Sequence, residues 1–196
     1  MAFTVRGGAG EFGTFGIMVA EVKDAVEKAH DLMARGVANV RILDRAGAAT
    51  TVEKLARREF GHSLSSEQLA LVAETSDLLQ QPDERLSSVF YDRLFEIAPD
   101  VRSLFPKDMA PQRRKFVDTL VALLSHASEP GSFKETLAGL AQRHVRYGAL
   151  PEHYGPVGNA LLFALEDRLG DRFTANVKLA WTLLYLDLAA AMSPST

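Results

Sequence analysis

The stretch "LAQRHVRYGALPEHYGPVGNALL", residues 140–162, carries the pattern that decides how this chain folds. It predicts the end of one helix, a corner containing glycine and proline, and the start of a second helix with an apolar face. His144 lies near the end of the first helix. Taken alone, a histidine in such a place is more often a solvated or hydrogen-bonded helix residue than a metal ligand. Residues elsewhere in the chain are needed to choose between these two interpretations.

The composition limits the class of protein. With 196 residues, 47% of them hydrophobic, the chain can form one domain with a core, or one domain and a small appendage. A net charge of -3 indicates neither a nucleic acid nor an anionic membrane as partner. There is no cysteine, which excludes disulfides, thiolate metal sites and cysteine nucleophiles. The N-terminus does not resemble a secretion signal, and the apolar C-terminal run is short and contains Asp187, so we expect a cytoplasmic protein.

Residues 1–60 show a mixed α/β pattern. Strand-like segments are "AFTVR", "TFGIMVA" and "VANVRIL". Between the second and the third, apolar residues from Val22 to Met33 recur at helical spacing, and Gly36 is placed to end that helix. A turn at "DRAG" and a short helix through "VEKLARREF" follow. The glycine-rich "GGAGEFG" lacks the Lys-Ser/Thr ending of a phosphate loop, so we expect no nucleotide site there.

The remaining chain is predicted to be helical throughout. Ser65 and Gln68 have the spacing of a capping box that opens a helix, and a second helix runs from Asp83 to about Ile97. Prolines then separate further helical segments, and no strand pattern intervenes. Helices of mixed length with irregular corners favour an orthogonally packed helical domain over a four-helix bundle.

Three segments of this helical part carry a family resemblance. In chain order they are "VFYDRLFEIAPDVRSLF", "QRRKF" and "LAQRHVRYGALPEHYGPVGNALL". Together they resemble the globin module of bacterial flavohaemoglobins and of their single-domain relatives. The resemblance implies a mainly α protein, in which a globin fold of six to eight helices covers about residues 65–192 and follows the small mixed α/β segment. We therefore expect an N-terminal extension at residues 1–60 and a globin domain at residues 61–196.

The resemblance implies haem b as the cofactor and His144 as the ligand of its iron. A neutral imidazole is a standard axial ligand, and it leaves the opposite face of the iron free for a diatomic gas. Because the chain has no cysteine, the haem is expected to be bound noncovalently. For His153, one residue before Tyr154, we prefer the interpretation as a solvated side chain.

On the gas-binding side the resemblance implies Tyr91, Gln112 and Phe116. Gln112 and Phe116 are four residues apart and therefore share one helix face. Tyr91 is expected to direct its hydroxyl toward the bound gas, beside the Gln112 amide. From the residues alone, Tyr91 and Phe116 could equally be ordinary core side chains. Phe116 is larger than the aliphatic residue usual at this place in the resembled family, so we expect a restriction on ligand size or entry.

Further residues near the haem follow from the same resemblance. The resembled flavohaemoglobins place a tyrosine and a glutamate beside the proximal histidine. Tyr154 matches the tyrosine, but the C-terminal "AAAMSPST" offers no glutamate. The basic run from Arg113 to Lys115 is typical of a solvated helix face, and one of its members is a candidate for contact with a haem propionate. Three residues are expected to touch the haem, although each is an ordinary core position in sequence terms: Phe105, Tyr154 and Val157.

The expected function is reversible binding of oxygen and of other diatomic gases such as NO and CO. Flavin and nicotinamide reductase domains are missing from this sequence, so NO dioxygenation would need an external reductase, and we assign no catalytic residues. The alternative is a haem-based gas sensor or a protein-interaction module that signals through residues 1–60. The few strands of that segment also favour a homo-oligomer. Nucleic-acid and membrane partners are not expected.

Overall fold

The chain of this computed structural model divides into two compact units, Met1–Leu64 and Ser65–Thr196. The structure describes residues 2–8, 15–34, 37, 40–44, 46–52, 54–55, 64–76, 79, 84–125 and 130–192.

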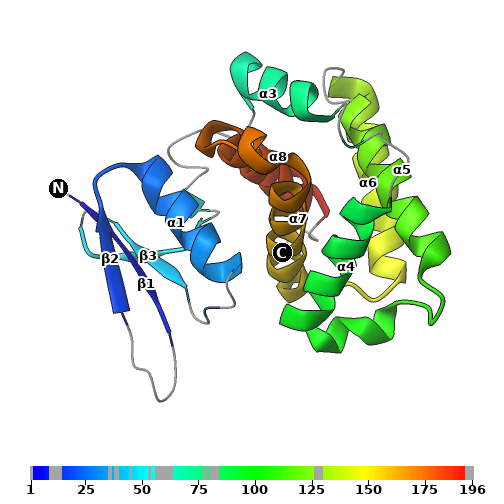
Figure 1. The fold of residues 1–196 in the computed structure, drawn as a ribbon, viewed down its shortest axis with the longest axis horizontal. Helices are drawn as coiled ribbons and strands as arrows, with labels where there is room; N and C mark the ends of the chain where they lie inside the picture. Colours follow the sequence, from blue (N-terminus) through cyan, green and yellow to red (C-terminus); the bar gives the residue numbers. More distant parts are fainter. Residues whose placement is uncertain are drawn as a thin grey trace. The chain divides into compact units, whose positions relative to one another are not determined.

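The first unit contains a four-stranded antiparallel sheet, with strand order β2-β1-β3-β4, and the helix α1 (Figure 1). In β1, Phe3 and Val5 are buried whereas Arg6 is exposed, which is the period-two pattern of a strand covered on one face. The α1 residues Ala25 and Val26 are buried as well, because α1 packs on β1. The elements are β1 (Phe3–Gly7), β2 (Phe15–Val19), α1 (Val22–Ala34), β3 (Arg41–Leu43) and β4 (Ala49–Thr50).

The predicted fold class is confirmed, and the details of this unit differ from the prediction at two strands. The strand β3 begins at Arg41, and residues 38–39 of the expected strand lie outside the described residues. The strand β4 was not predicted, because two residues show no alternation. The expected turn forms: Asp44 Oδ1 accepts hydrogen bonds from two backbone N–H groups, and Gly47 has φ 81°. Gly36, most of "GGAGEFG" and most of the expected helix over 52–60 lie outside the described residues.

The second unit is built from helices, as the sequence predicts. The capping box is present, since the Ser65 backbone N–H donates to Gln68 Oε1 at 2.8 Å and the Gln68 N–H donates to Ser65 Oγ at 3.2 Å. Pro99 opens a 3₁₀-helix, and Asp108 Oδ1 accepts from the N–H of Ala110 at the start of α5. The elements are α3 (Ser66–Ser76), α4 (Arg85–Ile97), η1 (Pro99–Leu104), α5 (Ala110–Ser125), α6 (Pro130–Arg146), η2 (Pro151–His153), α7 (Tyr154–Leu169), η3 (Gly170–Arg172) and α8 (Ala175–Met192).

The core of this unit is centred on α7 and α8 (Figure 1). The helix α8 packs on α3, α6 and α7, and α4 packs on α7. Trp181 is 1% exposed, and its Nε1 donates to Thr75 Oγ1 at 2.9 Å, so its polar atom is satisfied in the core. At the surface, Arg85 donates to both carboxylate oxygens of Asp167, which links α4 to α7. No helix in the described part of the chain has the length and apolar character needed to cross a membrane.

Candidate functional site

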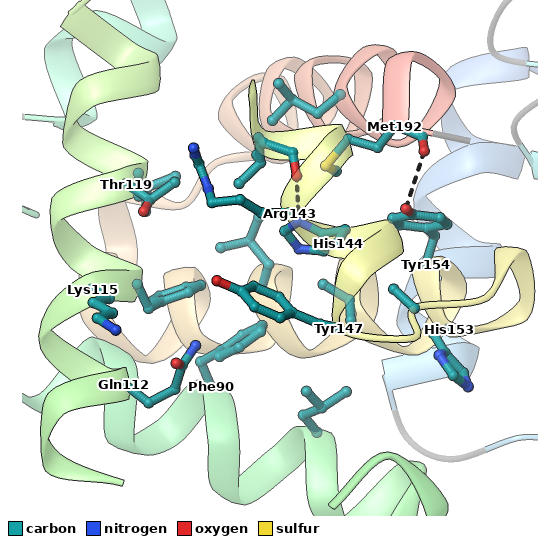
Figure 2. A pocket seen from close by; sticks show the side chains of 18 of the residues that line it. Phe90, Gln112, Lys115, Thr119, Arg143, His144, Tyr147, His153, Tyr154 and Met192 are labelled. Carbon is teal, nitrogen blue, oxygen red and sulfur yellow. Dashed lines mark hydrogen bonds between the residues drawn. The ribbon is translucent and has the colours of Figure 1, made fainter. Parts of the chain in front are cut away.

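A cavity of about 480 Å³ lies inside the helical unit. Residues of α4, η1, α5, α6, α7 and α8 form its walls, and most of the lining side chains are apolar. Figure 2 shows His144 reaching in from α6, and Gln112 and Lys115 from α5. The structure brings together every residue for which the resemblance implies a cofactor contact, because all seven line this cavity: Tyr91, Phe105, Gln112, Phe116, His144, Tyr154 and Val157.

His144 has a defined tautomer. It lies in the last turn of α6, and the chain then turns through Gly148, which has φ 81°, before the Pro151 that opens η2. The Nδ1 atom is 2.9 Å from the carbonyl oxygen of Leu140. Since a carbonyl can only accept, Nδ1 must carry the hydrogen. In the neutral ring Nε2 then carries no hydrogen, and its lone pair can bind a metal.

Two tyrosines tie α7 and α8 together beside His144. The Tyr154 hydroxyl donates to the carbonyl of Met192 at 3.3 Å, and the Tyr185 hydroxyl donates to the carbonyl of Tyr154 at 2.5 Å. Burial raises the pKa of Tyr154. Gly158 gives the Tyr185 ring its space, because a Cβ there would overlap the ring. The Tyr154 hydroxyl is thus held by a backbone carbonyl at the end of α8.

On the wall formed by α4 and α5, Tyr91 and Gln112 form a hydrogen-bonded pair. The amide Nε2 of Gln112 donates to the Tyr91 hydroxyl oxygen at 3.0 Å. Tyr91 is only 2% exposed, and burial raises its pKa, although the bond from Gln112 and the charge of Arg113 act in the opposite direction. Because the phenol oxygen accepts from Gln112, the Tyr91 hydrogen is available to a group in the cavity.

Aromatic rings pack around Tyr91, and we call Phe90, Tyr91, Phe95, Phe105 and Phe116 the aromatic cluster. Phe116 stacks on Phe90 with ring centroids 4.3 Å apart, and Phe105 meets Tyr91 edge-on at 5.5 Å. Such offset and edge-on pairs stabilise the core beyond the area that they bury. The cluster therefore fixes the wall that carries the Tyr91 hydroxyl.

Several residues that line the cavity were not predicted from the sequence. Phe90 precedes Tyr91 on α4, and an apolar residue at such a place is typical of an ordinary helix core. Tyr185, Leu188 and Met192 recur at the spacing of one helix face, which is the sequence signal that could have identified the α8 wall. Arg143 and Lys115 also line the cavity. Lys115 is the one member of the predicted basic run, Arg113 to Lys115, that lines it.

His153 is half-buried and lines the cavity, whereas a solvated side chain was expected. Its Nδ1 accepts the backbone N–H of Leu150 at 3.1 Å, so the ring caps the first turn of η2. This bond holds the corner between His144 and Tyr154 in place.

A family model described as Globin matches residues 88–192, which is more than half of the chain. The chain belongs to the globin family. The match runs from α4 to the end of α8 and so covers nearly every element that lines the cavity.

Curated relatives refine this assignment. A flavohemoprotein of Bacillus subtilis is 29% identical over 131 residues, which are 65% of this chain and 33% of that protein. Flavohemoproteins of Rhodopirellula baltica and Bordetella pertussis are each 31% identical, over 58% and 64% of this chain and 29% and 32% of their own lengths. The chain thus spans about a third of the length of these relatives. The family and its relatives confirm the expected resemblance, and they indicate haem binding.

Proposed function

We propose that this globin binds haem b through His144 Nε2 and that a diatomic gas bound to the haem would lie beside Tyr91. One observation carries the proposal: a histidine with a free Nε2 and a buried tyrosine with a free hydroxyl hydrogen line the same apolar cavity. Neither group alone would indicate a gas site, since a helical histidine and a core tyrosine are both common.

The residues present fit a haem. Cofactor pockets are typically about 300–1,000 Å³ and mostly apolar, with a few placed polar groups, and this cavity agrees in both respects. Haem is a flat apolar ring with two anionic propionates. Lys115 and Arg143 line the cavity and are suited to those charges, whereas the neighbouring Asp118 is not. Phe105 and Val157 would meet the ring itself.

When bound, haem supplies an iron that binds oxygen, NO or CO reversibly at its free position. The chain's own residues then perform three tasks. His144 holds the iron and is oriented by the Leu140 carbonyl. Tyr91 donates a hydrogen bond to the gas, and Gln112 fixes the direction of that hydroxyl. The aromatic cluster excludes water, which strengthens the hydrogen bond.

NO dioxygenation is the second part of the proposal. The relatives are named flavohemoproteins and are about three times as long as the matched region. A repeated reaction here would require electrons from a separate reductase, which we propose as a partner. A gas-sensing role is supported by a different observation, namely that residues 1–64 form a compact unit of their own. This unit is also where a signalling contact or a homo-oligomer contact would form.

The absorption spectrum of the purified protein tests the haem assignment. With haem supplied in excess, the wild-type chain should show a Soret band and a ferrous spectrum that shifts with CO. His144→Ala should lose this spectrum, whereas His30→Ala, which alters a histidine of α1 in the first unit, should retain it. A normal ferrous spectrum in His144→Ala would refute the assignment of the iron ligand.

A further inference from the structure

The strand β2 is an edge of the sheet in the first unit. It pairs with β1 on one side, and the strand order of the described sheet places no strand on its other side (Figure 1). An edge strand presents unpaired backbone N–H and C=O groups, and proteins commonly place charges or proline there to prevent further pairing. The β2 sequence, FGIMV, contains neither a charged residue nor proline. Its outer edge can therefore accept another strand.

Two apolar side chains of β2 are exposed, one on each face of the sheet. Met18 is 76% exposed and Phe15 is 40% exposed, and three positions separate them, so they point to opposite faces. The other edge strand, β4, consists only of Ala49 and Thr50 and offers a much shorter ladder. A partner strand would therefore bury more apolar surface and form more backbone bonds at β2 than at β4.

The β2 sequence is complementary to itself. When two copies run antiparallel with Ile17 opposite Ile17, Phe15 lies opposite Val19 and Gly16 lies opposite Met18. All five positions are then paired, and directly opposite residues lie on the same face of the sheet. The odd-numbered positions join apolar side chains, and the even-numbered positions join the largest exposed side chain of the strand to a glycine.

The surroundings of Gly16 suit the Met18 side chain of a second copy. A Cβ at position 16 would lie 3.2 Å from Cγ2 of Thr4 and 3.7 Å from Cγ of Arg6, so the apolar stem of Arg6 lies beside the glycine. Methionine is flexible and fills irregular spaces, and arginine stems commonly cover apolar groups. The Gly16–Met18 pair would therefore bury the most exposed side chain of β2.

We propose that β2 pairs with β2 of a second copy of this chain, so that two four-stranded sheets form one continuous sheet about a twofold axis at Ile17. Pairing of two identical antiparallel strands uses the same surface on both copies, which closes the assembly at a dimer. This inference gives a surface and a register to the homo-oligomer contact proposed above, and it rests on that part of the proposed function. It is independent of haem, because β2 contributes no residue to the cavity wall.

Analytical ultracentrifugation of the full-length chain measures the association. We expect a concentration-dependent dimer in the wild type. Met18→Lys would place a charge beside Arg6 of the other copy, and would do so twice by symmetry, so it should weaken the dimer on the order of ten-fold. Because Met18 is 76% exposed, this change should leave the fold of each copy intact. Ala49→Lys adds the same charge at an exposed position of the other edge strand, and should alter the association by less than about two-fold.

Cysteine cross-linking tests the register. The chain contains no cysteine, so a single introduced thiol is unique. Directly opposite residues of an antiparallel ladder have Cα atoms about 4.5–5.5 Å apart, which is within disulfide range. Ile17→Cys should therefore form a disulfide-linked dimer under mild oxidation. Val19→Cys is the matched control on the same strand and face, and it should not cross-link, because roughly 13 Å along the strand would separate the two thiols.

The outcomes separate this inference from the proposed function. A monomer at every concentration would overturn both the β2 pairing and the homo-oligomer contact. A dimer that Met18→Lys leaves unchanged, or that Ala49→Lys weakens equally, would keep the homo-oligomer and overturn the β2 pairing. Failure of Ile17→Cys to cross-link, or equal cross-linking of Val19→Cys, would overturn the register. If the dimer behaves as expected but the chain takes up no haem, the haem assignment is wrong and the β2 pairing stands.

Discussion

Replacing Tyr91 by phenylalanine removes one hydroxyl group and keeps the ring. The ring contacts with Phe105 and Phe116 should therefore remain, and the change isolates the hydrogen bond that the proposal assigns to Tyr91. Oxygen in a haem complex carries partial negative charge and accepts hydrogen bonds well, whereas carbon monoxide accepts them poorly. The variant should therefore release oxygen faster and leave the release of carbon monoxide nearly unchanged.

The size of the effect follows from the burial of the donor. A neutral hydrogen bond contributes about 1 kcal/mol net, and more where water is excluded, as it is around a tyrosine that is 2% exposed. Since about 1.4 kcal/mol corresponds to a factor of ten, oxygen release should accelerate roughly ten-fold or more.

The Gln112–Tyr91 bond also predicts how the two residues combine. In Gln112→Leu the Tyr91 hydroxyl still donates, so oxygen release should change less than in Tyr91→Phe. In Tyr91→Phe the amide has lost its acceptor and can turn toward the gas, which compensates in part. The effects of the two single substitutions should therefore not add in the double variant.

Stopped-flow measurement of the release rates of oxygen and carbon monoxide tests the role of Tyr91. It would compare the wild type with Tyr91→Phe, Gln112→Leu and the double variant. Equal acceleration of oxygen and carbon monoxide in Tyr91→Phe would indicate general damage to the pocket. No acceleration of either gas would leave Tyr91 as a core residue without the proposed role.

Three further predictions concern stability and organisation. Gly158→Ala should lower stability by about 1–3 kcal/mol in urea unfolding, since the added Cβ overlaps the Tyr185 ring, and no loss would contradict the close packing of α7 on α8. Hydrogen bonds from Arg85 hold the pKa of Asp167 below its usual value, so the pair stabilises the fold above about pH 4 and this contribution is lost as the pH falls. Because both side chains are partly exposed, Asp167→Asn should cost less than about 1 kcal/mol at neutral pH and nothing in strong acid, and a difference from wild type that persists in acid would refute this origin. Deletion of residues 1–64 should leave the Soret band intact while changing the elution volume in size-exclusion chromatography, because every residue that lines the cavity belongs to the second unit, and a folded truncation without haem would contradict it.

Local signals predicted much of the fold. The spacing of Ser65 and Gln68 predicted the start of α3, since both partners of a capping box lie within one turn. Short strand-like runs separated by a glycine-rich stretch predicted β1 and β2, whose pairing register the structure shows residue by residue. The strand β4 could not be predicted in this way, because two residues carry no period and form a strand only through pairing with β3.

The candidate site depended on the resemblance, for a physical reason. An apolar helix face looks the same in sequence whether it meets another side chain or a cofactor, so periodicity could not distinguish Phe90 or Val157 from ordinary core. The bond between Gln112 and Tyr91 joins residues 21 positions apart on different helices, and no spacing rule predicts it. The tautomer of His144 could not be predicted from the sequence either, because it depends on the position of the Leu140 carbonyl.

Exposure marks some of the apolar residues that line the cavity once the structure is known, although others, such as Leu161, are as buried as ordinary core. Phe105, Phe116 and Val157 are apolar and lie within the helical unit, yet each is half-buried, because part of its surface faces the cavity. Side chains such as Leu165 and Trp181, which meet only protein, are almost fully covered. Half-buried apolar residues around a cavity lose water contact when an apolar molecule fills it, and this burial favours binding in proportion to the area covered. The cavity wall would therefore contribute affinity for an apolar cofactor in addition to the bond that we propose for His144.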